Sequence, residues 1–167
     1  MSESASAFWR FSLRFYRRPE VPDVCLALQD QHSVDVNLLF FILFLAVSGR
    51  RIAADEMRKM DSCVRNWRTC VVQPLRAIRR DLKSGIAPLD AQAAAALRSA
   101  IKRDELEAEH LQQISLEREF PVESTGSSAQ PRAAAYANIA AYGKTFGLLP
   151  QTVINSLLQS LADEFLA

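Results

Sequence analysis

The sequence contains few of the residues that make turns or cross-links. Only 5 glycines and 7 prolines occur among 167 residues, which argues against a turn-rich β-sandwich or barrel. Its three cysteines are an odd number and none has Cys-x-x-Cys spacing, so a disulfide framework is not expected. The N-terminus lacks the basic-then-apolar order of a signal peptide. These absences predict a helical protein of the reducing cytoplasm.

Long apolar runs and a strong net charge are missing as well. The longest apolar run, residues 38–47, is about half as long as the stretch of about 20 residues that a membrane-spanning helix needs. The net charge is +1, so no overall field favours nucleic acid or a membrane surface. Apolar residues make up 49% of the chain, enough for a buried core in one domain of this length.

Helical periodicity is what the sequence does have. Apolar residues recur three and four positions apart, most clearly from Met57 to Val71. The run 36–48 follows a capping residue, Ser33 or Asp35, and ends at Gly49, which predicts a helix buried on most of its sides. We therefore predict an all-α bundle of about six to eight helices around this central apolar helix. The side chains expected to pack against it are Phe8, Phe11, Phe15, Leu26, Trp67, Val71, Leu75 and Ile78.

Proline, glycine and polar stretches divide the chain. Residues 1–120 form the predicted main domain, residues 121–130 a small polar linker, and residues 131–167 a C-terminal helical hairpin. The last helix has a wide apolar side, so we expect it to dock on the main domain or on a partner, either another protein or a second copy of the chain.

Inside the main domain, Pro74 predicts a kink or short break near residues 69–73, because proline cannot donate a helical hydrogen bond. Ser4 or Ser6 is expected to cap the first helix, and Gly85 and Pro88 to end the helical segment that begins near residue 53. A long helix over residues 91–117 is expected next. Its predicted inner side carries Leu97, Ile101, Ala108, Leu111 and Ile114.

One candidate functional surface is a basic stripe. Ten of the 20 basic residues lie between residues 50 and 83, against four acids. Those that share one side of the predicted helix are Arg58, Arg65, Arg68, Arg76, Arg79, Arg80 and Lys83. Such a face suits the phosphates of a nucleic acid or another anionic ligand. The alternative is a solvated face, or one paired internally with the acidic helix that carries Glu105, Glu107, Glu109, Glu117 and Glu119.

A second candidate is a polar group between two apolar segments. Its members are Gln29, Asp30, His32, Asp35 and Asn37, and buried groups of this kind require partners. One interpretation is a small ligand pocket formed with Trp9, Phe11 and Tyr16. The other is structural, with Asp35 as a helix cap, Asn37 and Gln29 bonding chain ends, and Asp30 paired with an arginine such as Arg10, Arg14 or Arg51.

Two patterns are compatible with metal chemistry. Glu107 and His110 have the Glu-x-x-His spacing of di-iron bundles, but no second such motif accompanies them. Cys63 and Cys70 share one helix side and are more typical of small core residues than of zinc ligands. Phosphate-binding glycine loops and nucleophile motifs are absent from the sequence. We predict no metal, no cofactor and no catalytic residue.

Several segments of the N-terminal half resemble a family of small proteobacterial helical proteins of unknown function. They are FWRFSLRFYRRP at residues 8–19, VCLALQD at 24–30, DVNLLF at 35–40 and VVQPLR at 71–76, with Trp67 before the last and Arg79 and Arg80 after it. The resemblance covers roughly residues 7–120. It implies a bacterial cytosolic helical protein and assigns no activity to any residue.

Three functions follow as hypotheses. The first is a non-enzymatic module for protein interaction or regulation, because the bundle pattern is good and no catalytic set is assembled. The second is a nucleic-acid or anionic-ligand binder that uses the basic helix over residues 58–83. The third is an enzyme or small-ligand protein that uses the polar group over residues 29–37.

Overall fold

The computed structural model describes residues 6–83, 90–147 and 149–166, and it confirms the prediction of an all-α bundle. None of the described helices is long and apolar enough to cross a membrane. Ser4, Gly85 and Pro88, to which boundary roles were assigned, lie outside the described residues. The elements are α1 (Ala7–Tyr16), α2 (Val21–His32), α3 (Val36–Val47), β1 (Arg50–Arg51), α4 (Ala54–Trp67), the π-helix η1 (Arg68–Val72), α5 (Gln73–Asp81), α6 (Ala91–Glu119), β2 (Ser127–Ser128), α7 (Pro131–Phe146) and α8 (Gln151–Phe165).

Helix α3 lies at the centre of the core. Every residue from Val36 to Ala46 is buried, as expected for a helix that is apolar on all sides. Helix α7 packs along one side of it. Phenylalanines of α1 cover another side, with ring centroids 4.9 Å apart for Phe8 and Phe41 and 5.0 Å apart for Phe15 and Phe40.

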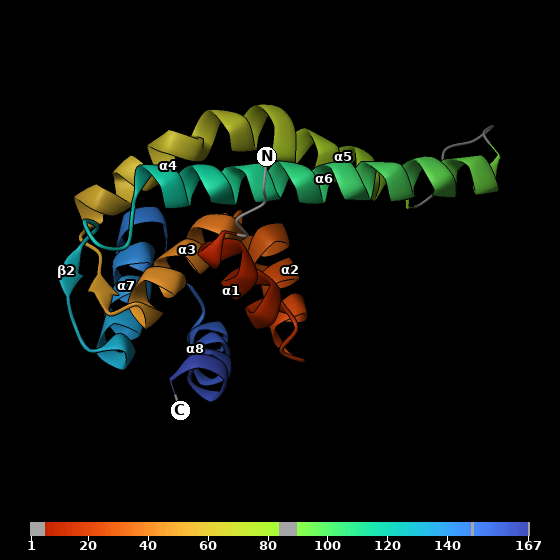
Figure 1. Cartoon of the computed structure of the whole chain (residues 1–167). Helices are drawn as coiled ribbons and strands as arrows, with labels where there is room; N and C mark the ends of the chain where they lie inside the picture. Colours follow the sequence, from red (N-terminus) through yellow and green to blue (C-terminus); the bar gives the residue numbers. More distant parts are fainter. Residues whose placement is uncertain (1–5, 84–89, 148, 167) are drawn as a thin grey trace.

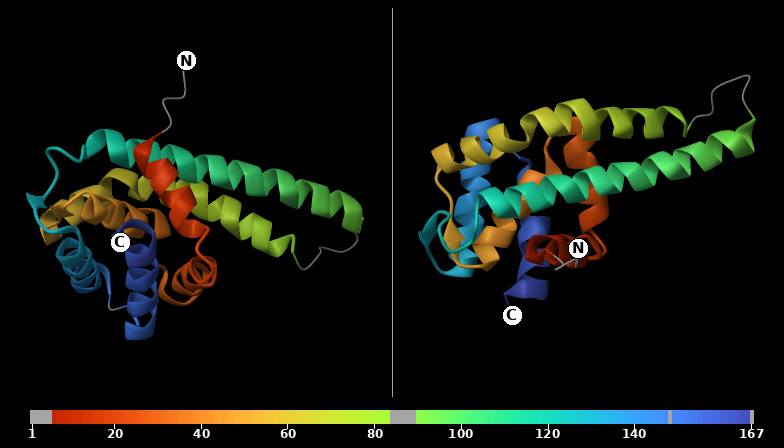
Figure 2. Two further views of the ribbon diagram at one scale, coloured as in Figure 1. Left: turned by 60° about the horizontal axis from the view of Figure 1, so that its bottom comes forward. Right: turned by 45° about the horizontal axis from the view of Figure 1, so that its top comes forward.

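Helix α6 is the longest element and spans the molecule (Figure 1). It runs antiparallel to α4, η1 and α5, and the two further views agree that α5 and the first half of α6 project beyond the other helices as a two-helix arm (Figure 2). Glu117, near the end of α6, accepts hydrogen bonds from the N–H groups of Ala7 and Phe8 at 3.1 and 3.3 Å. The body end of α6 therefore also caps the start of α1.

Some side chains predicted to be buried are exposed. Leu26 and Ile78 are each 48% exposed, and Trp67 is 38% exposed with its indole N–H donating to Ala108 O at 2.9 Å. The reason for Ile78 is its place on the arm, where α6 is the main helix packed against α5. Trp67 lies along the seam between α4 and α6, not in the core around α3.

The prediction of which residues of α6 face inward is also wrong for most of those named. Leu97, Leu111 and Ile114 are exposed, and of the predicted set only Ala108 is buried. The side that faces the bundle is largely polar, because it meets arginines and the polar start of α3. Its buried residues are Ala94, Glu105, Ala108, Gln112, Gln113 and Leu116.

Residues 121–130, predicted as a linker, hold a strand. Ser127 and Ser128 of β2 pair with Arg51 and Arg50 of β1 in an antiparallel ladder. The Arg50 side chain donates to the carbonyls of Thr125 and Gly126 at 2.6 and 2.7 Å. Helix α8 beyond it packs against α1, α2 and α7, and its apolar side, with Leu157 and Leu161, is buried there.

Asn138 of α7 joins three backbone groups in the core and is fully buried. Its Oδ1 accepts from Ile52 N at 2.8 Å, and its Nδ2 donates to Ile42 O at 2.9 Å and Arg50 O at 3.1 Å. We expect Asn138→Ala to lower the free energy of unfolding by about 3 kcal/mol, because buried backbone groups lose their partners. Urea unfolding followed by circular dichroism measures this.

The matched control is Asn155→Ala on α8, which removes an exposed side-chain hydrogen bond to Gln151. A change within about 0.5 kcal/mol is expected there. Equal effects of the two substitutions would contradict the role assigned to Asn138.

Candidate functional site

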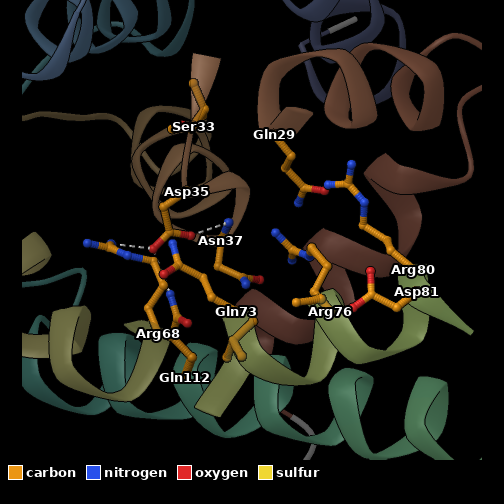
Figure 3. A pocket seen from close by; sticks show the side chains of 13 residues that line it. Gln29, Ser33, Asp35, Asn37, Arg68, Gln73, Arg76, Arg80, Asp81 and Gln112 are labelled. Atoms are coloured by element: carbon orange, nitrogen blue, oxygen red, sulfur yellow. Dashed lines mark hydrogen bonds and ion pairs between the residues drawn. The ribbon is translucent and has the colours of Figure 1, made fainter. Parts of the chain in front are cut away.

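A pocket of about 360 Å³ opens where the turn between α2 and α3 meets η1, α5 and α6 (Figure 3). We call it the polar pocket, because most of its lining side chains are polar or charged. These side chains are Gln29, Ser33, Val34, Asp35, Asn37, Arg68, Val72, Gln73, Arg76, Ala77, Arg80, Asp81 and Gln112. They come from segments far apart in the sequence.

Pro74 shapes the wall that η1 and α5 contribute. A regular helix is disturbed at this position, because proline has no N–H and its ring crowds the carbonyl four residues earlier. The chain widens into η1, where Gln73 N–H donates to Arg68 O, so the break predicted near residues 69–73 is present. The extra residue in the π-helical turn offsets the drift of an α-helix, so residues four positions apart stay on nearly the same side of the helix. The pocket residues with that spacing are Arg68, Val72, Arg76 and Arg80.

The opposite wall begins at a strained turn. Ser33 ends α2 in the left-handed conformation, with φ 52° and ψ 30°. A residue other than glycine costs about 1 kcal/mol in this conformation. The turn reverses the chain within three residues, between His32 at the end of α2 and Val36 at the start of α3. It thereby places Asp35 between the pocket and the first turn of α3.

Asp35 is the cap of α3, as one reading of the sequence predicted, and it does more. Its Oδ1 accepts from the N–H groups of Asn37 at 2.9 Å and Leu38 at 3.2 Å. Its Oδ2 accepts from Arg68 Nη1 at 2.7 Å and Gln112 Nε2 at 2.9 Å. Both carboxylate oxygens are therefore used, and Asp35 has little capacity left for a further donor.

Arg68 links this cap to α4. Its Nη2 lies 2.8 Å from Asp61 Oδ1, and Asp61 Oδ2 accepts from Arg65 at 2.5 Å. The side chains of Arg68 and Asp35 are only 17% and 7% exposed. Burial works against the charge of Arg68, but the carboxylates of Asp35 and Asp61 outweigh burial and raise the pKa of the guanidinium.

Two neighbouring amides of α6 complete the contact with α3. Gln113 Nε2 donates to Asn37 Oδ1 at 2.7 Å, beside the bond from Gln112 to Asp35. Both glutamines are at least 97% buried. Their Oε1 atoms accept no hydrogen bond from any residue in the described part of the chain. Each amide is thus anchored through its nitrogen and keeps an unused acceptor.

Arg76 and Arg79 bind α5 to α6. Arg76 Nε donates to Glu105 at 3.0 Å and its Nη2 to Glu109 at 2.6 Å, and Arg79 also donates to Glu105. Burial opposes ionisation of Glu105, but hydrogen bonds from Arg79 and Arg76 lower the pKa of this carboxyl below its ordinary value. Burial and the charge of Glu105 instead raise the pKa of Glu109, although Arg76 acts against them.

The polar pocket brings together members of both predicted surfaces. Gln29, Asp35 and Asn37 come from the polar group, and Arg68, Arg76 and Arg80 come from the basic stripe. The two sets are separate in the sequence, and the packing of η1 and α5 beside the α2–α3 turn places them around one space.

Other predicted residues lie elsewhere. Trp9 does not line the pocket and instead stacks on His110, with ring centroids 4.3 Å apart. Tyr16 is 44% exposed and also lies outside the lining. Asp30 is exposed too, and it pairs at 2.8 Å with Arg80, a partner that the sequence did not suggest.

In the basic stripe, Arg65 and Arg79 pair with Asp61 and Glu105 and do not line the pocket. Lys83 is exposed two residues beyond the end of α5. The five stripe arginines from Arg65 to Arg80 all have carboxylate partners. Only Arg76 and Arg79 pair with the acidic helix, whereas the side chains of Arg65 and Arg80 are more than half exposed.

Several residues of the site were not anticipated from the sequence, among them Asp61, Gln112 and Gln113. The available signal was a polar repeat on one side of α6. Glu105, Glu109 and Gln112 follow one another at spacings of four and three, which places them on one face. Of the acids expected to pair with the basic stripe, Glu105 and Glu109 do so, whereas Glu107 lies 3.7 Å from His110 and Glu119 pairs with Arg118.

Within residues 6–83, 90–147 and 149–166, no group of three or more His, Cys, Asp or Glu side chains could hold a metal ion. Cys63 and Cys70 are exposed on α4 and η1, and neither is bonded to another cysteine. Cys25 is buried in the core, and burial raises the pKa of its thiol to about 12. It therefore stays protonated at neutral pH.

Fold and site together define a class: an all-helical protein with a polar pocket lined by arginines, amides and a capping aspartate. The chain belongs to a family described as proteins of unknown function, DUF2390, whose family model matches residues 7–116. This match includes every lining residue of the polar pocket. No curated protein and no solved structure matches the chain.

Arg68→Gln should lower the free energy of unfolding by about 3–5 kcal/mol, because it leaves the buried Asp35 without a guanidinium partner and Asp61 with that of Arg65 alone. Chemical denaturation at pH 7 measures the loss. Arg58→Gln, at an exposed position on α4, is the control and should change stability by less than about 0.5 kcal/mol. A loss no larger than that of the control would show that the network is not needed for stability.

Glu105 and Glu109 should respond to pH in opposite ways. Because the folded pKa of Glu105 is lowered, its charge stabilises the fold above the ordinary pKa of 4.5, and this contribution is lost as the pH falls below that value. We expect Glu105→Gln to be less stable than wild type at pH 7 by about 1–2 kcal/mol, with a difference that shrinks in acid.

The folded pKa of Glu109 is raised, so ionising it works against folding at neutral pH. Glu109→Gln should therefore lower the free energy of unfolding less than Glu105→Gln does at pH 7. The stability of wild type relative to Glu109→Gln should increase as the pH falls from neutral through the raised pKa. Urea unfolding of the three proteins between pH 3 and pH 8 tests both signs. Parallel pH profiles for the two variants would contradict this assignment.

Proposed function

We propose that the protein is a non-enzymatic binding module that holds a small polar ligand in the polar pocket. One observation carries the proposal: two polar sets that are separate in the sequence converge on one space of about 360 Å³. This volume is in the range of small-molecule sites. Exposed side chains, among them Gln73, Arg80 and Asp81, stand at its rim, so a ligand can enter from solvent.

The backbone around the pocket supports this proposal. Both walls depart from regular geometry, one through η1 and the other through the left-handed Ser33. π-Helical turns and strained residues occur frequently at functional sites, where they place side chains that regular helices would not. Here they position Arg68 on one wall and Asp35 on the other, in direct contact.

The lining favours binding over catalysis. Its described residues include no histidine, cysteine, lysine or tyrosine, and Ser33 is their one hydroxyl. Activation of such a hydroxyl requires a base within hydrogen-bond reach. Asp35 is two residues away in sequence, but both of its oxygens are already occupied by four donors.

The other two hypotheses have less support. A nucleic-acid surface needs arginines that can reach phosphates, whereas the five stripe arginines from Arg65 to Arg80 are paired with carboxylates. A protein-interaction role stays a prediction, with exposed apolar side chains along α6 in its favour. The apolar side of α8, where a partner was expected, is covered by α1, α2 and α7. The cytoplasmic setting and the bacterial origin stay predictions too.

Filling the pocket should abolish binding without disturbing its polar network. Ala77 is an exposed lining residue on α5, so Ala77→Leu adds bulk to the pocket and keeps a good helix former. We expect a panel of small polar molecules, screened by two-dimensional NMR of the whole chain, to contain binders that shift pocket amides. Their affinity should fall at least tenfold in Ala77→Leu.

Ala95→Leu, at an exposed position on α6 outside the pocket lining, is the matched control and should bind as wild type does. Binders that lose no affinity in Ala77→Leu would contradict the proposed site. A panel that shifts no pocket amide at millimolar concentration would contradict the proposed function itself.

A further inference from the structure

Building on the proposed binding function, we propose that the polar pocket takes a small oxyanion, a carboxylate or phosphate group, held between Arg76 and Arg80. The two arginines lie four residues apart on α5, which places them on the same side of the helix. Figure 3 shows their side chains on the side of α5 that faces Gln29 of α2.

The first argument is the hydrogen-bond capacity that remains in the lining. Asp35 and Arg68 satisfy each other and their neighbours, so they offer little to a ligand. Arg76 uses Nε and Nη2 on α6, and its Nη1 has no partner among the described residues. Arg80 uses Nη1 on Asp30 and, within the same part of the chain, neither Nε nor Nη2 is bonded. The unused charged groups at the wall of α5 are therefore donors and favour a ligand rich in acceptors. Gln112 Oε1 on the wall of α6 is an unused neutral acceptor, which suits a hydroxyl of the same ligand or of an acid form.

The second argument is that both guanidinium groups are already held in place. Arg76 is fixed by Glu105 and Glu109 of α6, and Arg80 is oriented by one half-exposed ion pair with Asp30 of α2. Long arginine side chains otherwise lose conformational entropy when a ligand binds. Because their positions are set by the fold, an oxyanion binds them with less of this loss.

Size and charge narrow the ligand further. A space of about 360 Å³ accommodates a small molecule and not a folded polymer. The neighbouring carboxylates neutralise much of the arginine charge, and Asp81 at the rim opposes an anion directly. We therefore expect modest affinity that decreases with salt and increases when Asp81 is neutralised.

The test is isothermal titration calorimetry and two-dimensional NMR of the full chain at low salt, in an amine buffer that contains no competing oxyanion. Inorganic phosphate, citrate and uncharged glucose serve as the three probes. Arg80→Gln removes a charge from a half-exposed position, so the variant should fold, which circular dichroism verifies. We expect it to weaken phosphate or citrate binding about tenfold or more. Asp81→Asn should tighten it about threefold.

Arg58→Gln on α4, an exposed position outside the pocket lining, is the matched control and should leave affinity unchanged. A preference for phosphate over citrate, or the reverse, identifies which oxyanion the pocket takes. Equal losses in Arg80→Gln and Arg58→Gln would show a general charge effect and overturn the assignment to Arg80.

Failure of this proposal is distinguishable from failure of the proposed function. If glucose or another neutral molecule binds in a manner that Ala77→Leu abolishes, while neither anion shifts pocket amides, the pocket is a binding site but not for oxyanions. If no probe shifts these amides, both proposals are overturned. Binding of a single-stranded oligonucleotide in the absence of phosphate or citrate binding would instead support a nucleic-acid surface.

Discussion

The ion pair between Arg68 and Asp35 is the contact on which the arrangement of the helices depends. Asp35 begins the central helix α3, and Arg68 begins the π-helical turn between α4 and α5. Their contact therefore connects the core helix α3 to η1, at the base of the two-helix arm. Asp61 holds the other side of the same guanidinium, so α4 shares in the contact. Because a buried guanidinium needs carboxylate partners, the relative positions of α3 and α4 are constrained closely.

The same requirement explains why α6 faces the bundle with a polar side. Glu105 and Glu109 meet the arginines of α5, and Gln112 and Gln113 meet Asp35 and Asn37 at the start of α3. Each of these contacts needs a particular register between two helices, which an apolar seam does not demand to the same degree. The polar side of α6 thus contributes specificity to the packing, while the apolar core around α3 provides most of the burial.

The polar pocket follows from this packing. Its arginine and glutamine side chains are anchored by partners on the surrounding helices, so they remain along the walls and the space between them stays open. Pro74 contributes by widening the helix before α5, and Ser33 by turning the chain sharply before α3. The family match covers all of these residues. The pocket therefore lies wholly within the segment that the family model matches, from α1 into α6.

Local chemistry made part of this structure predictable. The apolar residues of α3 have no polar side to expose, so burial followed from the sequence, as did the cap at Asp35 and the break before Pro74. The exposed Leu26 and Ile78 were not predictable in this way, because an apolar residue is buried only where another element covers it. The position of the two-helix arm, which leaves Ile78 uncovered, depends on contacts across the whole chain.

The candidate site shows the same division. From the sequence alone, the polar group at residues 29–37 and the basic residues at 58–83 were recognisable, because each is a local cluster. Only the tertiary structure decided that three members of each set meet in one pocket, that Arg80 pairs with Asp30, and that Trp9 and Tyr16 lie elsewhere. The reason is that α6 carries apolar and polar residues around its circumference, so its orientation is set by the partners that the buried arginines require.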